Sequence, residues 1–199
     1  MTPNGQKSPE EAAKALVDAA SKSDIKGVIQ LLPPDEMAVL YDYGQVLLDQ
    51  SDMSDLSSTL NDAGVAISDV QWTTSEVTGG TKVSLASITL TAEGQTVTIK
   101  NSNGTLTVSG IEGQPAIELN DSTIETYINE AAGTSDLDPQ LIDIIKREFK
   151  QIVNLGFVTV NVDGAWYVSP FRTGSDVFLS VLKGLEPADI DYLISLAQN

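Results

Sequence analysis

The sequence predicts an α+β protein in which a curved antiparallel sheet packs against several helices. Segments rich in Val, Ile, Thr and Leu follow one another directly, whereas helical patterns stand before and after them. The five segments are 65–77, 81–92, 95–100, 104–109 and 115–119, and turns containing Gly separate them. Strands that run together favour an antiparallel meander over alternating βαβ units.

A later hairpin, at 157–168, adds two strands to this prediction. Val158, Val160 and Val162 alternate with polar residues, and Asp163-Gly164 suits a two-residue type I′ turn. That turn sets the register, which pairs Val162 with Ala165, Asn161 with Trp166 and Val160 with Tyr167. Both faces carry large apolar side chains, so we expect a central hairpin that helices cover.

Helical patterns flank the strands on both sides. Ser8 is a typical N-cap before Pro9 and an apolar stripe, and Asp138-Pro139 begins the strongest helical pattern of the chain. The predicted helices are 8–21, 24–32, a third that Asp35-Glu36 opens and that extends to Leu48, 120–131, 138–154, 173–183 and the segment from 187 onward. Residues 1–7 are expected to form a flexible linker, and 8–199 a single α+β domain. Two lobes, at about 8–119 and 120–199, are the alternative.

Composition excludes several classes of function. The 199 residues include 28 acidic and 11 basic ones, a net charge of −17, which disfavours binding to nucleic acid or to anionic lipid. Cysteine and histidine are both absent. No Ser-His-Asp or Cys-His triad, thiolate nucleophile or imidazole metal site can therefore form, and an enzyme would depend on carboxylates, Tyr, Lys, Arg or Ser. We expect no catalytic residues and no cofactor.

The two ends of the chain resemble the nuclear transport factor 2-like (NTF2-like), or cystatin-like, superfamily. The resemblance rests on SPEEAAKALVDAASKSDIKGVIQLLPPDE at 8–36 and on DGAWYVSP at 163–170. It implies an N-terminal helical hairpin on the concave side of a strongly bent sheet. More narrowly, the combination resembles exported domains of actinobacterial membrane proteins or lipoproteins. This implies an extracytoplasmic location after removal of a signal or anchor, and a cytoplasmic location is the alternative. The sequence contains no run of 18 apolar residues, so direct membrane insertion is not predicted.

Six residues are candidates for ligand or partner binding, each with a structural alternative. They are Tyr41, Tyr43, Trp72, Trp166, Tyr167 and Arg172. In isomerases and dehydratases of the resembled superfamily, Tyr and Asp act as oxyanion donor and base, which draws attention to Tyr41-Asp42-Tyr43. Consecutive helical residues diverge by about 100°, however, so the alternative is a Tyr at the core edge beside a solvated Asp. The aromatic residues could equally be core, and Arg172 could pair with an internal carboxylate.

The acidic residues between 49 and 62 do not match a calcium loop, because Met53 occupies the third ligand position and no Gly follows at the sixth, so no metal site is predicted. The leading hypothesis is a non-enzymatic extracytoplasmic module that binds a partner protein or a small apolar ligand. One alternative is a pocket enzyme of isomerase or dehydratase type that uses carboxylate and Tyr. The other is a structural dimerisation domain, and a homodimer is compatible with each reading.

Overall fold

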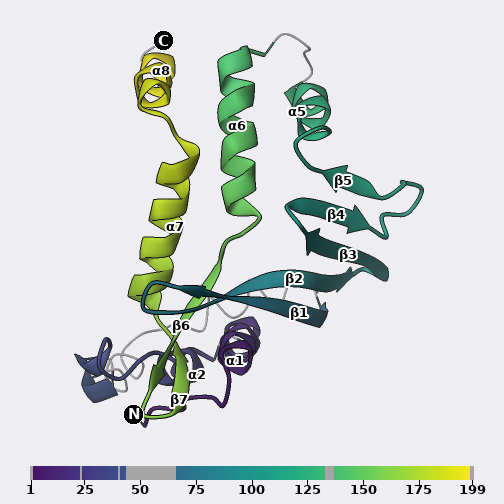
Figure 1. Cartoon of the computed structure of the whole chain (residues 1–199). Helices are drawn as coiled ribbons and strands as arrows, with labels where there is room; N and C mark the ends of the chain where they lie inside the picture. The colour runs from purple at the N-terminus through teal and green to yellow at the C-terminus, as the bar shows by residue number, and fades with distance from the viewer. Residues whose placement is uncertain (1, 23, 40, 44–65, 133–136, 198–199) are drawn as a thin grey trace.

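The computed structural model describes residues 2–22, 24–39, 41–43, 66–132 and 137–197, which are arranged around a seven-stranded antiparallel sheet (Figure 1). The strands are β1 (Ala66–Val77), β2 (Gly80–Ala92), β3 (Gln95–Ser102), β4 (Thr105–Ser109), β5 (Ile117–Leu119), β6 (Gly156–Val162) and β7 (Ala165–Val168). The α+β class is confirmed, and β1 to β5 match the predicted meander segments to within two residues at each end.

The long strand β2 joins the two parts of the sheet. Along one edge it pairs with β1, from Gly80 to Thr91. Its other edge is shared, because residues 81–84 pair with β6 and residues 87–92 pair with β3. The path through the sheet is therefore β5-β4-β3-β2-β6-β7, with β1 beside β2. Leu85 and Ala86 lie at the junction between β6 and β3.

A β-bulge marks this junction. Leu85 lies opposite Trp72, whereas Ser87 lies opposite Gln71, so Ala86 is an extra residue in β2. A bulge of this kind shifts the alternation of side chains by one residue. The apolar alternation in the sequence shifts at the same place, since Val83 and Leu85 have odd numbers and the next apolar residues, Ile88 and Leu90, have even ones.

The bulge gives the meander one apolar and one polar face. Ile88 pairs with Ile99 and Leu90 with Val97, while Thr89 and Thr91 occupy the opposite face. There the Thr89 and Thr98 hydroxyl oxygens lie 3.3 Å apart and those of Thr91 and Thr96 lie 3.2 Å apart. Such cross-strand threonine pairs are typical of a sheet face that contacts water.

The β6–β7 hairpin has the predicted turn and register. Asp163 and Gly164 have φ angles of 52° and 86°, as a type I′ turn requires, and Val162 pairs with Ala165. The prediction of a central position is wrong, because β7 is the last strand of the path. Its free edge is instead covered by the N-terminal segment, where Gln6 and Trp166 exchange two backbone hydrogen bonds of 2.8 Å. Periodicity within the hairpin carries no signal for such a distant partner.

The helices divide between the two ends of the sheet (Figure 1). Helices α1 (Pro9–Ser21) and α2 (Ile25–Gln30) lie near the hairpin, and α1 contacts β1, β2, β6 and β7. At the other end α6 (Pro139–Ile152) and α7 (Pro170–Gly184) stand side by side, and α5 (Ile124–Ala132) packs on α6. Helix α8 (Pro187–Ala197) continues beyond α7. Within the described residues, none of the helices is both long and apolar enough to cross a membrane.

The helix starts follow the capping residues. Ser8 Oγ accepts the Glu11 N–H at 3.1 Å, and Asp138 Oδ1 accepts the Gln140 N–H at 2.8 Å. Helix α7 begins three residues earlier than its apolar pattern predicts. The reason is Ser169, whose Oγ accepts the Arg172 N–H at 3.1 Å, so that Pro170 becomes the first helical residue.

Candidate functional site

Two of the predicted site residues, Tyr41 and Tyr167, belong to the core. The Tyr41 hydroxyl donates to the Leu32 carbonyl at 2.7 Å. Burial, and next the nearby Tyr167, raise the pKa of Tyr41 to about 12. Tyr167 is buried with its ring against Gly5, where an added Cβ would lie 2.5 Å from Cζ. Tyr41 is therefore a neutral phenol whose hydroxyl donates to the Leu32 carbonyl.

Arg172 takes part in an internal network at the start of α7. Its Nε lies 3.5 Å from Glu36 Oε1. The Glu36 carboxylate also accepts the Ser169 hydroxyl, at 2.6 Å from Oε2, and Ser169 is fully buried. Arg172 thus pairs with a carboxylate of its own chain, which is the structural alternative for this residue.

The remaining candidates lie apart from one another. Tyr43 is exposed, and Trp166 is half-buried in β7 opposite Asn161. Trp72 lies on β1, at the wall of a cavity. The six residues therefore do not form one site, and Trp72 is the member that lines the apolar cavity described next.

The Trp72 cavity has a volume of about 420 Å³ and lies between the sheet, α1 and the inner side of α7. Its lining is almost wholly apolar and comprises Val17, Val70, Trp72, Leu85, Ile88, Leu155, Gly156, Phe157, Thr173 and Val177. The Trp72 and Phe157 rings are 6.3 Å apart and tilted by 56°, which braces the Trp72 side chain. A volume of this size suits a small organic molecule.

The Trp72 indole nitrogen is the unusual feature of this wall. Nε1 is buried, and it has no hydrogen-bond partner within the described part of the chain. Leaving a buried donor unpaired costs about 1–3 kcal/mol, so native structures seldom tolerate it without a ligand or water. The hydroxyl of another lining residue, Thr173, accepts the Val158 N–H at 2.9 Å and can still donate its own hydrogen.

A second apolar hollow adjoins the Trp72 cavity at the junction in the sheet. It has a volume of about 280 Å³ and shares Leu85 and Leu155 with the first. Its other walls come from β3, β4 and the end of α6, including Phe149. Both spaces lie at the junction where β2 changes its partner from β6 to β3, and Leu85 at this junction lines both.

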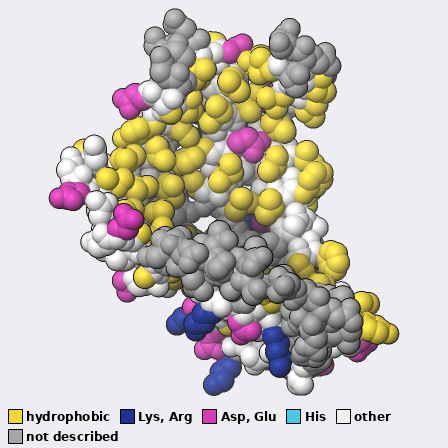
Figure 2. Space-filling model, turned by 180° about the vertical axis from the view of Figure 1, so that it is seen from behind, with side chains coloured by type: hydrophobic (Ala, Val, Ile, Leu, Met, Phe, Trp, Pro, Cys, Tyr) yellow, Lys and Arg dark blue, Asp and Glu magenta, His cyan; other side chains and the backbone are white. Residues whose placement is uncertain are grey.

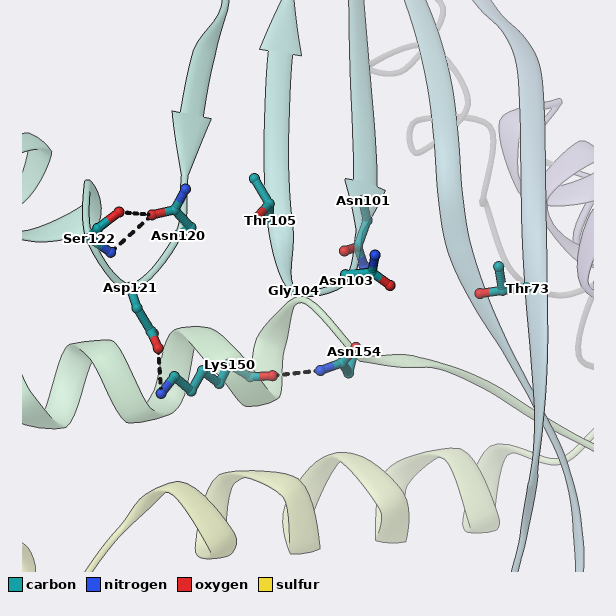
Figure 3. A pocket seen from close by; sticks show the side chains of 10 residues that line it. All are labelled: Thr73, Asn101, Asn103, Gly104, Thr105, Asn120, Asp121, Ser122, Lys150 and Asn154. Carbon is teal, nitrogen blue, oxygen red and sulfur yellow. Dashed lines mark hydrogen bonds and ion pairs between the residues drawn. The ribbon is translucent and has the colours of Figure 1, made fainter.

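A larger polar hollow, of about 750 Å³, lies beside the end of α6 (Figure 3). Most of its polar groups already bond to one another. Lys150 Nζ lies 2.6 Å from Asp121 Oδ2, and Asn120 Oδ1 accepts the Ser122 hydroxyl at 2.6 Å. Asn101 donates to the Val153 carbonyl, and Asn154 donates to the Lys150 carbonyl. Since these groups are satisfied and exposed to water, the hollow offers little to a ligand, and the Trp72 cavity is the better candidate.

No Asp, Glu, Lys, Arg or Tyr contributes to the lining of the Trp72 cavity. Nor does the described part of the chain bring three Asp or Glu residues together as metal ligands. The acidic segment between 49 and 62 lies outside the described residues. Sequence analysis identified Trp72 but missed Leu85, Ile88 and Leu155, although the shifted alternation at Ala86 is a signal for the bulge.

Comparison with known proteins gives no relative. No family model, no curated protein and no solved structure matches the chain.

Proposed function

We propose that this chain is a non-enzymatic binding module that holds a small apolar ligand in the Trp72 cavity. The observation that carries the proposal is the almost wholly apolar cavity of about 420 Å³, whose wall includes Trp72, a residue with a buried Nε1–H that has no partner among the described residues. A ligand that satisfies this donor carries one hydrogen-bond acceptor, such as a carbonyl or ether oxygen, on an apolar body.

The proposal includes a fold of the NTF2-like type and a location outside the cytoplasm. Two features support it: α1 packs on the sheet, and the DGAWYV segment forms the closing hairpin. Both are the features on which the resemblance rests. A test of the location is fractionation of cells that express the full natural gene product, followed by immunodetection.

The binding proposal is tested with a matched pair of probes. 2-Acetylnaphthalene and 2-ethylnaphthalene have similar shapes, but the first alone carries a carbonyl acceptor. We expect the ketone to bind about tenfold more tightly, because one added hydrogen bond is worth about 1 kcal/mol or slightly more. Isothermal titration calorimetry on the purified chain measures both affinities.

Three variants sharpen this experiment. Val177→Phe fills the cavity and is expected to abolish binding of both probes, whereas Val39→Phe, at an exposed site elsewhere, leaves binding unchanged. Trp72→Phe removes the donor, so the ketone loses its advantage over the hydrocarbon. Equal affinities for the two probes in the wild type, or binding that survives Val177→Phe, overturns the proposal.

A further inference from the structure

Helix α7 presents its apolar side to solvent. Phe171, Phe178, Leu179, Val181 and Leu182 lie on its exposed side, and Ile190, Ile194 and Leu196 extend this surface along α8. We call these eight side chains the α7–α8 strip. Their exposed fractions lie between 38% and 65%. Figure 2 shows hydrophobic side chains gathered over the upper half of the molecule, where the helices α6 to α8 and the β3–β5 end of the sheet stand.

The inner side of α7 is filled by small and polar residues. Ser180 and Gly184 are buried, and the Glu148 carboxylate lies against Gly184. Asp176 forms a 2.7 Å ion pair with Lys82 of β2. A helix on the surface of a monomer normally turns its apolar side inward. The Asp176–Lys82 ion pair and the close packing at Gly184 anchor the helix in the orientation that exposes the strip.

The strip has the size of a protein interface. With about 150–200 Å² for a large apolar side chain, the measured exposures give on the order of 700 Å². This exceeds the roughly 300–600 Å² of the largest apolar patch on a typical monomer, and it approaches the roughly 800 Å² that each partner contributes to a standard interface.

Exposed charges of both signs lie along the strip. Helix α7 contributes Lys183, since its Arg172 is paired with Glu36 and its Asp176 with Lys82. The α8 end contributes Glu186 and Asp191, since Asp189 is paired with Arg147. A two-fold axis across the strip can place Lys183 of one copy beside the acidic α8 end of the other, which is the geometry of an isologous interface.

We propose that the α7–α8 strip is the interface of a homodimer of this chain. The two-fold arrangement buries both copies of the strip and pairs their charges, while the carboxylates elsewhere on an acidic chain remain in solvent. The inference is independent of the ligand proposed for the Trp72 cavity, because that cavity uses the inner side of α7 and the dimer uses the outer side.

The first test measures molecular mass by sedimentation equilibrium across a concentration series of the purified chain. We expect reversible association to twice the monomer mass of 21.1 kDa. The double variant Phe178→Glu/Leu182→Glu should raise the dimer dissociation constant by on the order of 30-fold or more. The matched control Val39→Glu/Tyr43→Glu adds the same charge at two exposed residues elsewhere and should leave it unchanged. A monomer at every concentration, an aggregate of undefined mass, or equal effects of the two double variants overturns the proposal.

The second test uses the natural absence of cysteine. Leu182→Cys places a single thiol on the strip, and Val39→Cys places one at an exposed control position. A short bis-maleimide should join two copies of the first variant and not of the second. The two-fold pairing also predicts that Lys183→Glu weakens the dimer and that adding Glu186→Lys restores it. Cross-linking of both thiol variants alike, or no recovery in the charge-swapped variant, contradicts the two-fold arrangement.

Discussion

The two ends of this molecule differ in how far they bury their apolar side chains. At the hairpin end, formed by α1, α2, β6 and β7, apolar residues such as Ala12, Val158 and Val168 are buried, with exposures of 0%, 1% and 2%. At the helical end, formed by α6, α7 and α8, Asp189 is 3% exposed and Phe178 is 63% exposed. The helical end leaves large apolar side chains of α7 and α8 exposed.

This difference shows that an amphipathic pattern predicts a helix but does not decide which side of the helix is buried. The periodic apolar residues of α7 form a helix whichever way the helix faces. The orientation is decided by Arg147, whose guanidinium donates to both the Gly184 carbonyl and Asp189 Oδ2, and by the Asp176–Lys82 pair. Polar contacts between distant elements thus decide which side of α7 becomes a surface.

The largest expected effect is on the free energy of unfolding, which should fall much more when a core aromatic residue is truncated than when an aromatic residue of the strip is truncated. Tyr167→Ala should destabilise the chain by about 3 kcal/mol or more, because it opens a cavity between Gly5 and Tyr41. Phe178→Ala should change the free energy of unfolding by about 0.5 kcal/mol or less. Urea unfolding at concentrations that favour the monomer measures both. Equal losses would mean that the strip belongs to the core.

The next effect tests the buried carboxylate of the helical end. The Glu186 N–H, and next Arg147, hold the pKa of Asp189 below its ordinary value. A depressed pKa contributes stability above the unfolded value of about 3.9, and this stability is lost as the pH falls through the folded pKa. Asp189→Asn should therefore lower the urea midpoint at pH 6 and have little effect at the acid end. The exposed Asp143→Asn is the control, and a pH-independent loss in Asp189→Asn would contradict the assignment.

A smaller effect probes the hydrogen bond of Tyr41 at the hairpin end. Tyr41→Phe should cost about 0.5–1.5 kcal/mol, because the Leu32 carbonyl loses its donor. Absorbance at 295 nm, at pH values where the chain stays folded, should show one phenol with a pKa of about 12 that is missing from the variant. Because this pKa is raised, the contribution is present below pH 10 and is lost as the pH rises. A variant with an unchanged titration curve would place the shifted phenol elsewhere.

The smallest expected effect is a gain in stability at the helical end. Burial raises the pKa of Glu148, whose Oε1 has no hydrogen-bond partner among the described residues. A raised carboxyl pKa leaves stability intact at low pH and reduces it as the pH rises, so this charge opposes folding at neutral pH. Glu148→Gln should raise the urea midpoint slightly at pH 7 and not at pH 3. A loss at pH 7 would show that Glu148 has a stabilising partner.

Sequence reasoning was strongest where short-range geometry decides the structure. Asp163-Gly164 dictates a type I′ turn, and that turn sets the register of Val162 with Ala165 without any distant contact. Caps such as Ser8 and Asp138 likewise begin helices through hydrogen bonds two or three residues away. It was weakest for the site, where Trp72 alone of six candidates lines the apolar cavity. The burial of Tyr167 depends on Gly5, which lies far away along the chain. The burial of Tyr41 depends on packing against the segment that contains Leu32.

The sequence by itself determined the α+β class, the strand order along the chain and the hairpin register, because turns, caps and periodicity act over a few residues. Only the tertiary structure decided that β2 shares one edge between β3 and β6, that an apolar cavity lies beside Trp72, and that α7 turns its apolar side outward. Each of these depends on contacts between segments up to a hundred residues apart, for which local periodicity carries no information.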